Sequence, residues 1–393
     1  MLLRSRILQA PSPVRRMIGA VLVLVSAPAC DLFTAPGHDQ TRVTVRWRFS
    51  GGGASGELYA DSALVVFYPP SGTSVWAVDA ATGSLRWHRD LTVPAVVPTG
   101  ALPLRAPVVA GSVVVIPGWD LYGLDRASGT IRWTLRNDDL PAFETVLGDG
   151  AVFSAGIGRV YRVDPASGAV AWQTQVGEWS DTIVERPFAP VYGDGVVYVV
   201  TAVIGIGAYT VPLGRRIGHV VALSATSGAT LWRFEIPEAP PFNGGAVGPG
   251  VVAGDVLIVG ADNGRVYGLD RATGTPRWVH QGSQPYEAGG VIVDGVAITG
   301  NLDGHVEGLD PATGRLLWGT GFASSVSNRI ARGEGVGLVS RGRLEAYDAS
   351  GQERWGHGGA AWGGPVYLSA PASYGRLVYV GDPAALYALV PPQ

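Results

Sequence analysis

A nine-residue phrase recurs along this chain, and every copy ends in tryptophan. The copies are DAATGSLRW from Asp79, DRASGTIRW from Asp125, DPASGAVAW from Asp164, SATSGATLW from Ser224, DRATGTPRW from Asp270, DPATGRLLW from Asp310 and, one residue shorter, DASGQERW from Asp348. Repetition at a nearly constant period indicates that one small structural unit is copied along the chain and stacked on its neighbours.

Each copy of the phrase predicts a hairpin turn. A short apolar strand such as residues 266–269 ends in the Asp, and the strand that carries the Trp follows the Gly. The Asp side chain can accept hydrogen bonds from nearby backbone amides, and Gly tolerates a positive φ. Two more short strands lie upstream, as at residues 108–109 and 113–116. We therefore predict that each unit is a four-stranded antiparallel meander.

The tryptophans of the fourth strands are spaced by 40, 46, 39, 60, 46, 40 and 37 residues. They are Trp47, Trp87, Trp133, Trp172, Trp232, Trp278, Trp318 and Trp355. A period near this length with four strands per unit is typical of propeller blades, whose sheets are covered on both faces. We interpret these residues, called the docking tryptophans below, as wedges between blades. The alternative, an aromatic ligand cage, would require the rings to converge at one place.

The two ends of the repeat region predict how a ring of blades closes. Residues 43–49, which include Trp47, read as a fourth strand with no first three strands before it. Residues 366–368, 377–380 and 386–389 read as three strands without a fourth. Joining the two ends predicts an all-β, eight-bladed propeller of four-stranded antiparallel blades, in which the N-terminal strand completes the last blade. Closure also removes an exposed sheet edge.

The N-terminal region reads as an export signal. Arginines precede the apolar run 18–25, which is too short to span a bilayer but suits a signal peptide. We predict a signal peptide over residues 1–29, a tether over 30–41 and the propeller over 42–390. The sequence around Cys30 resembles a lipobox, so Cys30 is the predicted lipidation site; an ordinary secretory cleavage beside a chance cysteine is the alternative.

The amino-acid composition limits the catalytic groups, metal sites and ligands that this chain can have. All 29 basic residues are Arg, which excludes a Schiff-base lysine, and the net charge of −3 does not favour nucleic acid. The single cysteine cannot form an intramolecular disulfide. The six histidines show no metal-binding spacing, and no G-x-S-x-G nucleophile elbow is present. We predict no catalytic residue, no metal and no cofactor.

The repeats resemble the tryptophan-docking repeat of the propellers named after pyrroloquinoline quinone (PQQ), roughly over residues 42 to 390. Among these, the exported chain with its lipobox-like cysteine is most similar to BamB-type lipoproteins of outer-membrane protein assembly. The resemblance implies a non-enzymatic scaffold, outside the cytoplasm on the periplasmic or extracellular side and membrane-anchored through Cys30, that binds envelope proteins as a monomer. A PQQ-dependent dehydrogenase and a ligand-sensing or carbohydrate-associated propeller are the alternatives.

The longest Trp spacing, from Trp172 to Trp232, predicts a partner-binding surface. We expect the extra length in two loops on one face, residues 173–187 between blades and residues 203–218 within the next blade. Apolar and aromatic side chains beside arginine are typical of interaction hot spots. The predicted partner-binding residues are Trp119, Trp179, Ile204, Ile206, Tyr209, Arg215 and Arg216. The alternative is an insertion folded back on its own propeller.

Overall fold

A computed structural model provides the structure of the chain. It describes residues 43–91, 105–136, 144–156, 158–178, 183–205, 217–321, 324–326, 329–359, 366–367 and 369–392. These residues belong to one compact unit, residues 39–393. Every regular element among them is a β-strand. Within these ranges no helix has the length and apolar character needed to cross a membrane.

The strands form eight four-stranded sheets, which we call blades. Blades 1 to 4 contain β2 (Ser55–Ala60), β3 (Leu64–Tyr68), β4 (Ser74–Asp79), β5 (Leu85–Asp90); β6 (Val108–Ala110), β7 (Val113–Pro117), β8 (Leu121–Asp125), β9 (Ile131–Leu135); β10 (Glu144–Gly148), β11 (Ala151–Ala155), β12 (Arg159–Val163), β13 (Val170–Gln175); β14 (Ile183–Gly193), β15 (Val196–Gly205), β16 (Gly218–Ser224), β17 (Thr230–Ile236). Blades 5 to 7 contain β18 (Val251–Ala253), β19 (Val256–Gly260), β20 (Arg265–Asp270), β21 (Pro276–Gln281); β22 (Gly290–Val293), β23 (Val296–Gly300), β24 (Val306–Leu309), β25 (Leu316–Gly319); β26 (Ala331–Arg332), β27 (Gly337–Ser340), β28 (Leu344–Tyr347), β29 (Glu353–His357). The eighth, the closure blade, contains β30 (Ala372–Tyr374), β31 (Leu377–Gly381), β32 (Leu386–Val390) and β1 (Thr44–Phe49).

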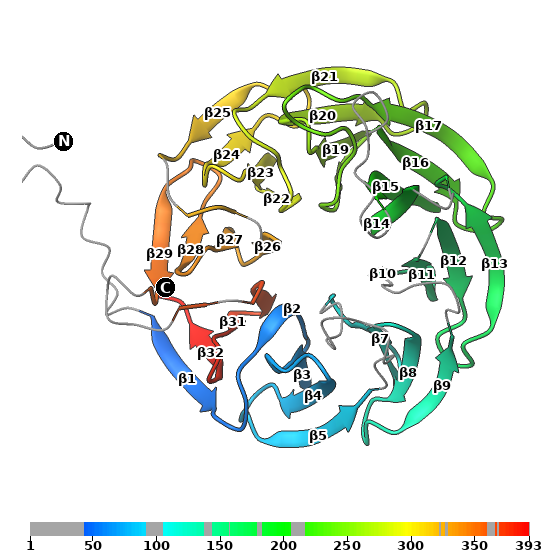
Figure 1. Cartoon of the computed structure of the whole chain (residues 1–393). Helices are drawn as coiled ribbons and strands as arrows, with labels where there is room; N and C mark the ends of the chain where they lie inside the picture. The colour runs from blue at the N-terminus through cyan, green and yellow to red at the C-terminus, as the bar shows by residue number, and fades with distance from the viewer. Residues whose placement is uncertain are drawn as a thin grey trace, which may run out of the picture. The chain divides into compact units, whose positions relative to one another are not determined.

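The blades stand around a ring (Figure 1). In blades 1 to 7 the strands pair in chain order and are antiparallel, as a meander requires. The strand that carries the docking tryptophan lies at the rim, whereas the first strand of a blade lies nearest the centre (Figure 1). The predicted fold, an eight-bladed propeller, is confirmed.

The closure of the ring is also confirmed. Strand β1 pairs antiparallel with β32, and the register places Trp47 opposite Ala388. One detail of the prediction is wrong, because the first strand of this blade is β30 rather than residues 366–368. Tyr367 and Ser369 form only isolated bridges to other blades. The reason is local: Gly375 has a positive φ of 53°, which makes the tight turn that pairs β30 with β31.

The core consists of apolar layers between neighbouring blades. All five residues of β3, of β7, of β11 and of β19 are buried, so these strands read as continuous apolar runs rather than alternating ones. One buried cluster, for example, joins Val66 and Tyr68 of blade 1 to Val114 and Ile116 of blade 2. These second strands therefore have little freedom to tilt, and each pairs with the first strand of its blade, which lies nearest the centre of the ring.

The repeated phrase forms the expected turn. In its first copy, the Asp79 Oδ1 accepts hydrogen bonds from the amides of Ala81 and Thr82, at 3.0 and 2.9 Å. Gly83 has a φ of 72°, a conformation that residues with a Cβ rarely adopt. Arg86 donates to the same carboxylate, and this contact lowers the pKa of Asp79 to about 2.

Blade 4 accounts for the longest Trp spacing in a way the sequence did not predict. Strand β13 runs on to Gln175 and β14 starts at Ile183, so much of the predicted loop 173–187 is strand. Strands β14 and β15 have 11 and 10 residues, about twice the length of their counterparts in other blades. Part of the extra length therefore extends the sheet instead of forming loops.

Candidate functional site

The docking tryptophans make the same contact at seven of the eight junctions between blades. In each, the indole Nε1 donates a hydrogen bond of 2.8 to 3.1 Å to a backbone carbonyl of the next blade. The ring also covers the Gly of the next turn so closely that a Cβ there would lie within 2.7 Å of ring carbons. The tryptophans are thus spread around the rim, one per blade, and each of these seven rings serves a different junction.

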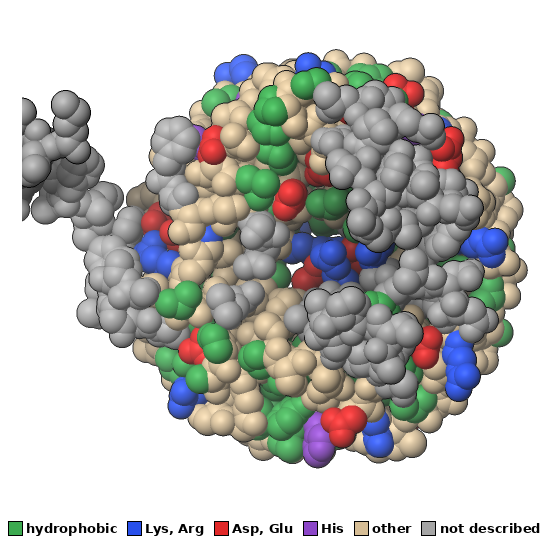
Figure 2. All heavy atoms as spheres, viewed as in Figure 1, with side chains coloured by type: hydrophobic (Ala, Val, Ile, Leu, Met, Phe, Trp, Pro, Cys, Tyr) green, Lys and Arg blue, Asp and Glu red, His purple; other side chains and the backbone are tan. Residues whose placement is uncertain are grey.

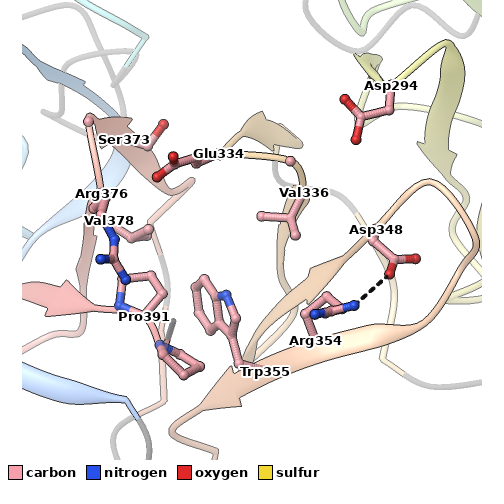
Figure 3. Close-up of a pocket in the computed structure, with 14 residues that line it drawn as sticks. Asp294, Glu334, Val336, Asp348, Arg354, Trp355, Ser373, Arg376, Val378 and Pro391 are labelled. Atoms are coloured by element: carbon pink, nitrogen blue, oxygen red, sulfur yellow. Dashed lines mark hydrogen bonds and ion pairs between the residues drawn. The ribbon is translucent and has the colours of Figure 1, made fainter.

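The eighth docking tryptophan differs. Trp355 is 7% exposed, about as buried as Trp87 at 6%, yet no described residue accepts a hydrogen bond from its indole. It lies instead beside a cavity at the junction with the closure blade (Figure 3).

The predicted partner-binding residues fall mostly outside the described residues. This holds for Trp179, Ile206, Tyr209, Arg215 and Arg216, and it also holds for the predicted lipidation site Cys30. Ile204 is the penultimate residue of β15, where its backbone pairs with Val184. Trp119, between β7 and β8, is partly buried against the apolar cluster of blades 1 and 2. The prediction that these residues form one surface therefore stays a prediction.

The centre of the ring holds a group of ion pairs that the sequence analysis missed. Glu57 lies in β2 and Glu144 lies in β10, the first strands of their blades. Arg105 lies shortly before β6, and Arg329 lies shortly before β26. Arg329 contacts Glu57 at 2.8 Å and Glu144 at 2.9 Å. Arg105 contacts the same carboxylates at 3.6 and 3.2 Å. Figure 2 shows these charge types, blue and red, exposed together at the bottom of the central opening.

This central cluster connects blades that are not neighbours, since blade 7 contacts blades 1 and 3 through one guanidinium. Glu144 is 1% exposed and Glu57 is 7% exposed, so both carboxylates depend on the arginines for compensation. Arg186 of β14 lies close by, and its guanidinium carbon is 4.9 Å from the centre of the Phe188 ring. Burial lowers the pKa of Arg186, whereas the charge of Glu144 opposes this change.

Two further carboxyls, those of Asp262 and Glu287, have raised pKa values. Burial, together with the negative charge of Glu287, raises the pKa of Asp262 to about 7. Burial also raises the pKa of Glu287. A carboxyl that titrates near neutral pH can act in proton transfer, which makes Asp262 a candidate acid or base. In the described part of the chain, however, no group of three or more acidic or histidine side chains is placed to hold a metal ion.

A second polar cluster is buried in blade 4. The carboxylate of Glu185, 2% exposed, accepts hydrogen bonds from Thr201 and from the Arg233 guanidinium, and its Oε1 lies 2.5 Å from His219 Nδ1. Burial opposes ionisation of this carboxyl, but the bonds from His219 and Thr201 lower its pKa overall. Arg233 also donates to the Val176 carbonyl of the preceding segment. The cluster therefore connects all four strands of blade 4, β14 to β17.

A sequence signal for these sites exists but is weak. Charged residues stand in the first strands of blades 1, 3 and 4, whereas most other positions of the first strands are apolar. These charged residues are Glu57, Glu144, Glu185 and Arg186. Which of them meet depends on blades far apart in the sequence, as with Arg329 and Glu144, 185 residues apart.

The repeated docking contacts and the eight-bladed ring define the class of protein, a β-propeller of PQQ-like repeats. The family model described as "Outer membrane protein assembly factor BamB" matches residues 37–217 and 216–361. These matches cover most of the chain, and the chain therefore belongs to this family.

Solved structures with the same fold include a BamB protein and two dehydrogenases. BamB from Moraxella catarrhalis is 18% identical, with a TM-score of 0.57, over 79% of this chain and 90% of that one. Quinohemoprotein alcohol dehydrogenase from Comamonas testosteroni is 16% identical, with a TM-score of 0.63, over 89% and 77%. A europium-containing methanol dehydrogenase is 13% identical, with a TM-score of 0.67, over 90% and 94%. No curated protein matches the sequence significantly. At these identities the likeness shows the fold alone.

Proposed function

We propose that this protein is a non-enzymatic scaffold of the cell envelope that holds protein partners during outer-membrane protein assembly. The observation that carries the proposal is the match of an assembly-factor family to residues 37–217 and 216–361. A closed propeller suits this role, because its ring of packed blades presents loops on two faces and leaves only short strand edges.

The centre of the ring supports a role without catalysis. Glu57 and Glu144 each contact both Arg105 and Arg329, so each carboxylate is already neutralised by cations of the protein itself. A carboxylate engaged in this way is a poor metal ligand and a poor general base, because either task requires that it first lose a buried ion pair. We therefore assign no catalytic role to this central cluster.

The partner surface and the anchor complete the proposal. We assign partner binding to the predicted surface of Trp119, Trp179, Ile204, Ile206, Tyr209, Arg215 and Arg216, and we assign membrane attachment to an acylated Cys30. The buried cluster around Glu185 joins β14, β15 and β16 of the same blade. A monomer tethered by lipid would remain at the membrane while its ring contacts a partner.

A PQQ-dependent dehydrogenase is the second candidate. The observation that favours it is Asp262, whose pKa is raised to about 7 by burial. Two of the solved structures compared above are dehydrogenases by name.

Deletion of the gene in the native host tests the scaffold function. We expect the abundance of outer-membrane β-barrel proteins to fall and to recover when the gene is restored. Restoration with Cys30→Ser should fail to recover it and should leave the protein in the soluble fraction. An unchanged outer-membrane proteome would contradict the proposal. Turnover of alcohols or sugars by the purified protein with PQQ, Ca²⁺ and an artificial electron acceptor would establish the second candidate instead.

A further inference from the structure

A cavity of about 820 Å³ lies between blade 7 and the closure blade. Figure 3 shows Trp355 at its base, Glu334 across from the indole, and Arg376 and Pro391 along one side. Glu334 belongs to the hairpin turn between β26 and β27, and Arg376 belongs to the turn between β30 and β31. Pro391 directly follows β32.

In two other junctions the same place is filled by an arginine side chain. Between blades 4 and 5, the guanidinium of Arg271 donates to Asp194 Oδ2 at 3.0 Å, to the Gly193 carbonyl at 3.1 Å and to the Gly254 carbonyl at 2.7 Å. Between blades 1 and 2, Arg126 donates to Asp61 Oδ2 at 2.7 Å. Each arginine directly follows the Asp of a repeated phrase.

Strand registers identify the equivalent positions in the cavity. Gly268 of β20 pairs with Trp278, and Arg271 follows three residues later; Ala388 of β32 pairs with Trp47, and Pro391 follows three residues later. Pro391 therefore stands where Arg271 stands in blade 5. The guanidinium that fills these two of the seven other junctions has no counterpart here.

The groups that receive the guanidinium of Arg271 have counterparts in the cavity. The turn Asp194–Gly195 joins β14 to β15, and the turn Glu334–Gly335 joins β26 to β27, closed by the bond from the Gly333 amide to the Val336 carbonyl at 2.8 Å. Glu334 is thus equivalent to Asp194, and Gly333 to Gly193. By the same comparison of hairpins, Gly375 is equivalent to Gly254.

We propose that this cavity binds the guanidinium group of an arginine side chain that a protein partner presents. Glu334 would pair with the cation, the carbonyls of Gly333 and Gly375 would accept its remaining N–H groups, and the Trp355 indole would contact its planar face. The methylenes of the arginine would pack against Val336 and Pro391, which also line the cavity.

The charge of the cavity agrees with a cationic ligand. Three carboxylates, Asp294, Glu334 and Asp348, and two guanidiniums, Arg354 and Arg376, line it. Arg354 is paired with Asp348 at 3.5 Å, as the dashed line in Figure 3 shows. Glu334 is exposed and makes no ion pair with any residue that the structure describes. Arg376 opposes binding of a cation but lies on the other wall.

This inference rests on the proposed scaffold function in one respect, namely that the partner is a protein. A small probe tests the cavity separately, so the cavity can fail while the scaffold function stands. The probe is N-acetyl-L-arginine amide, added to the purified full chain, and its binding is followed by the indole ¹⁵N–¹H signals, with Trp355 assigned from Trp355→Phe. N-acetyl-L-citrulline amide, which has nearly the same shape without the charge, is the control ligand.

We expect saturable binding of the arginine probe that shifts the Trp355 signal, and no such binding of the citrulline probe. Glu334→Gln should weaken binding about tenfold, because it removes a charge-assisted hydrogen bond. Pro391→Arg should abolish binding by filling the cavity from within the chain. Asp194→Asn, the matched change at a junction that Arg271 already fills, should leave binding unchanged.

Absence of saturable binding, or equal binding of citrulline, would overturn the proposal. So would binding at the level of the native chain in a folded Glu334→Gln variant, judged by unchanged circular dichroism. That variant decides the question if Pro391→Arg does not fold.

Discussion

Val43 and Trp355 belong to one buried cluster. Each of the seven other docking tryptophans covers a glycine of the next blade, and Val43 occupies the position equivalent to that glycine. The strand registers establish this equivalence. Thr44, the residue after Val43, lies opposite Val390. In blade 1, Ser84, the residue after Gly83, lies opposite Asp79 in the same way. A valine is possible at this position because β1 pairs with β32 from the other end of the chain, so no hairpin turn joins the two strands here as it does in the other blades. The other junctions have no such freedom.

We expect that a methyl group in the turn of a regular junction is far more damaging than one in a neighbouring turn. Gly129 and Gly111 both have positive φ, 69° and 59°, but only Gly129 faces an indole, with the nearest Trp87 atom at 2.6 Å from an added Cβ. Gly111→Ala should lose about 1 kcal/mol from backbone strain alone. Gly129→Ala should lose roughly 2 kcal/mol more from overpacking. Urea denaturation of the two variants measures the difference; equal losses would contradict it.

Among the described residues Trp87 has a hydrogen-bond acceptor for its indole and Trp355 has none, which predicts unequal responses to the same substitution. Trp87 and Trp355 are 6% and 7% exposed, so replacement by Phe removes similar buried area. Trp87→Phe also removes the bond from Nε1 to the Arg126 carbonyl at 2.9 Å, worth about 1 kcal/mol. The free energy of unfolding should therefore fall by about 1 kcal/mol more in Trp87→Phe. A larger loss in Trp355→Phe would show that the indole N–H has a partner in solution.

Neutralising a carboxylate of the central cluster should destabilise the protein. Glu144→Gln leaves Arg105 and Arg329 with one counter-charge, Glu57, and we expect a loss of roughly 2 kcal/mol, less than for fully buried pairs because the arginines are partly exposed. Asp255→Asn, in the exposed pair with Arg277, serves as the control and should lose under about 1 kcal/mol. Thermal unfolding in 0.05 and 0.5 M salt gives a second readout, because salt should shrink only the effect of the control.

Asp262 predicts a pH dependence of stability. Its pKa is raised to about 7 in the folded protein, above the value of about 3.9 expected when unfolded. The folded state therefore keeps a proton that the unfolded state has released, so the stabilisation is full below about pH 4 and is lost as the pH rises through about 7.

Asp262→Asn removes this loss of stability. The free energy of unfolding of the variant, relative to that of the native chain, should therefore rise by a few kcal/mol between pH 5 and pH 8. Asp90→Asn, at an exposed carboxyl of β5, is the control and should follow the native chain at every pH. A difference between Asp262→Asn and the native chain that does not vary with pH would contradict the raised pKa.

The sequence by itself determined the architecture. The seven phrases and eight docking tryptophans fix the length, strand count and turn of each blade, because these depend on contacts within one unit or between adjacent units. For the same reason the sequence predicts that the strand around Trp47 completes the last blade. Local information was insufficient where signals compete: residues 366–368 read as a strand, but the turn at Gly375 places β30 at Ala372–Tyr374.

Only the tertiary structure decided which charged groups meet. Arg329 and Glu144 are separated by 185 residues and by several blades along the chain, yet the closed ring places them 2.9 Å apart. Likewise, Pro391 acquires significance only when the strand registers align it with Arg271 of another blade. The physical reason is that ion pairs and cavities depend on distances of a few ångströms between blades, and those distances are set when the ring closes and its apolar layers pack.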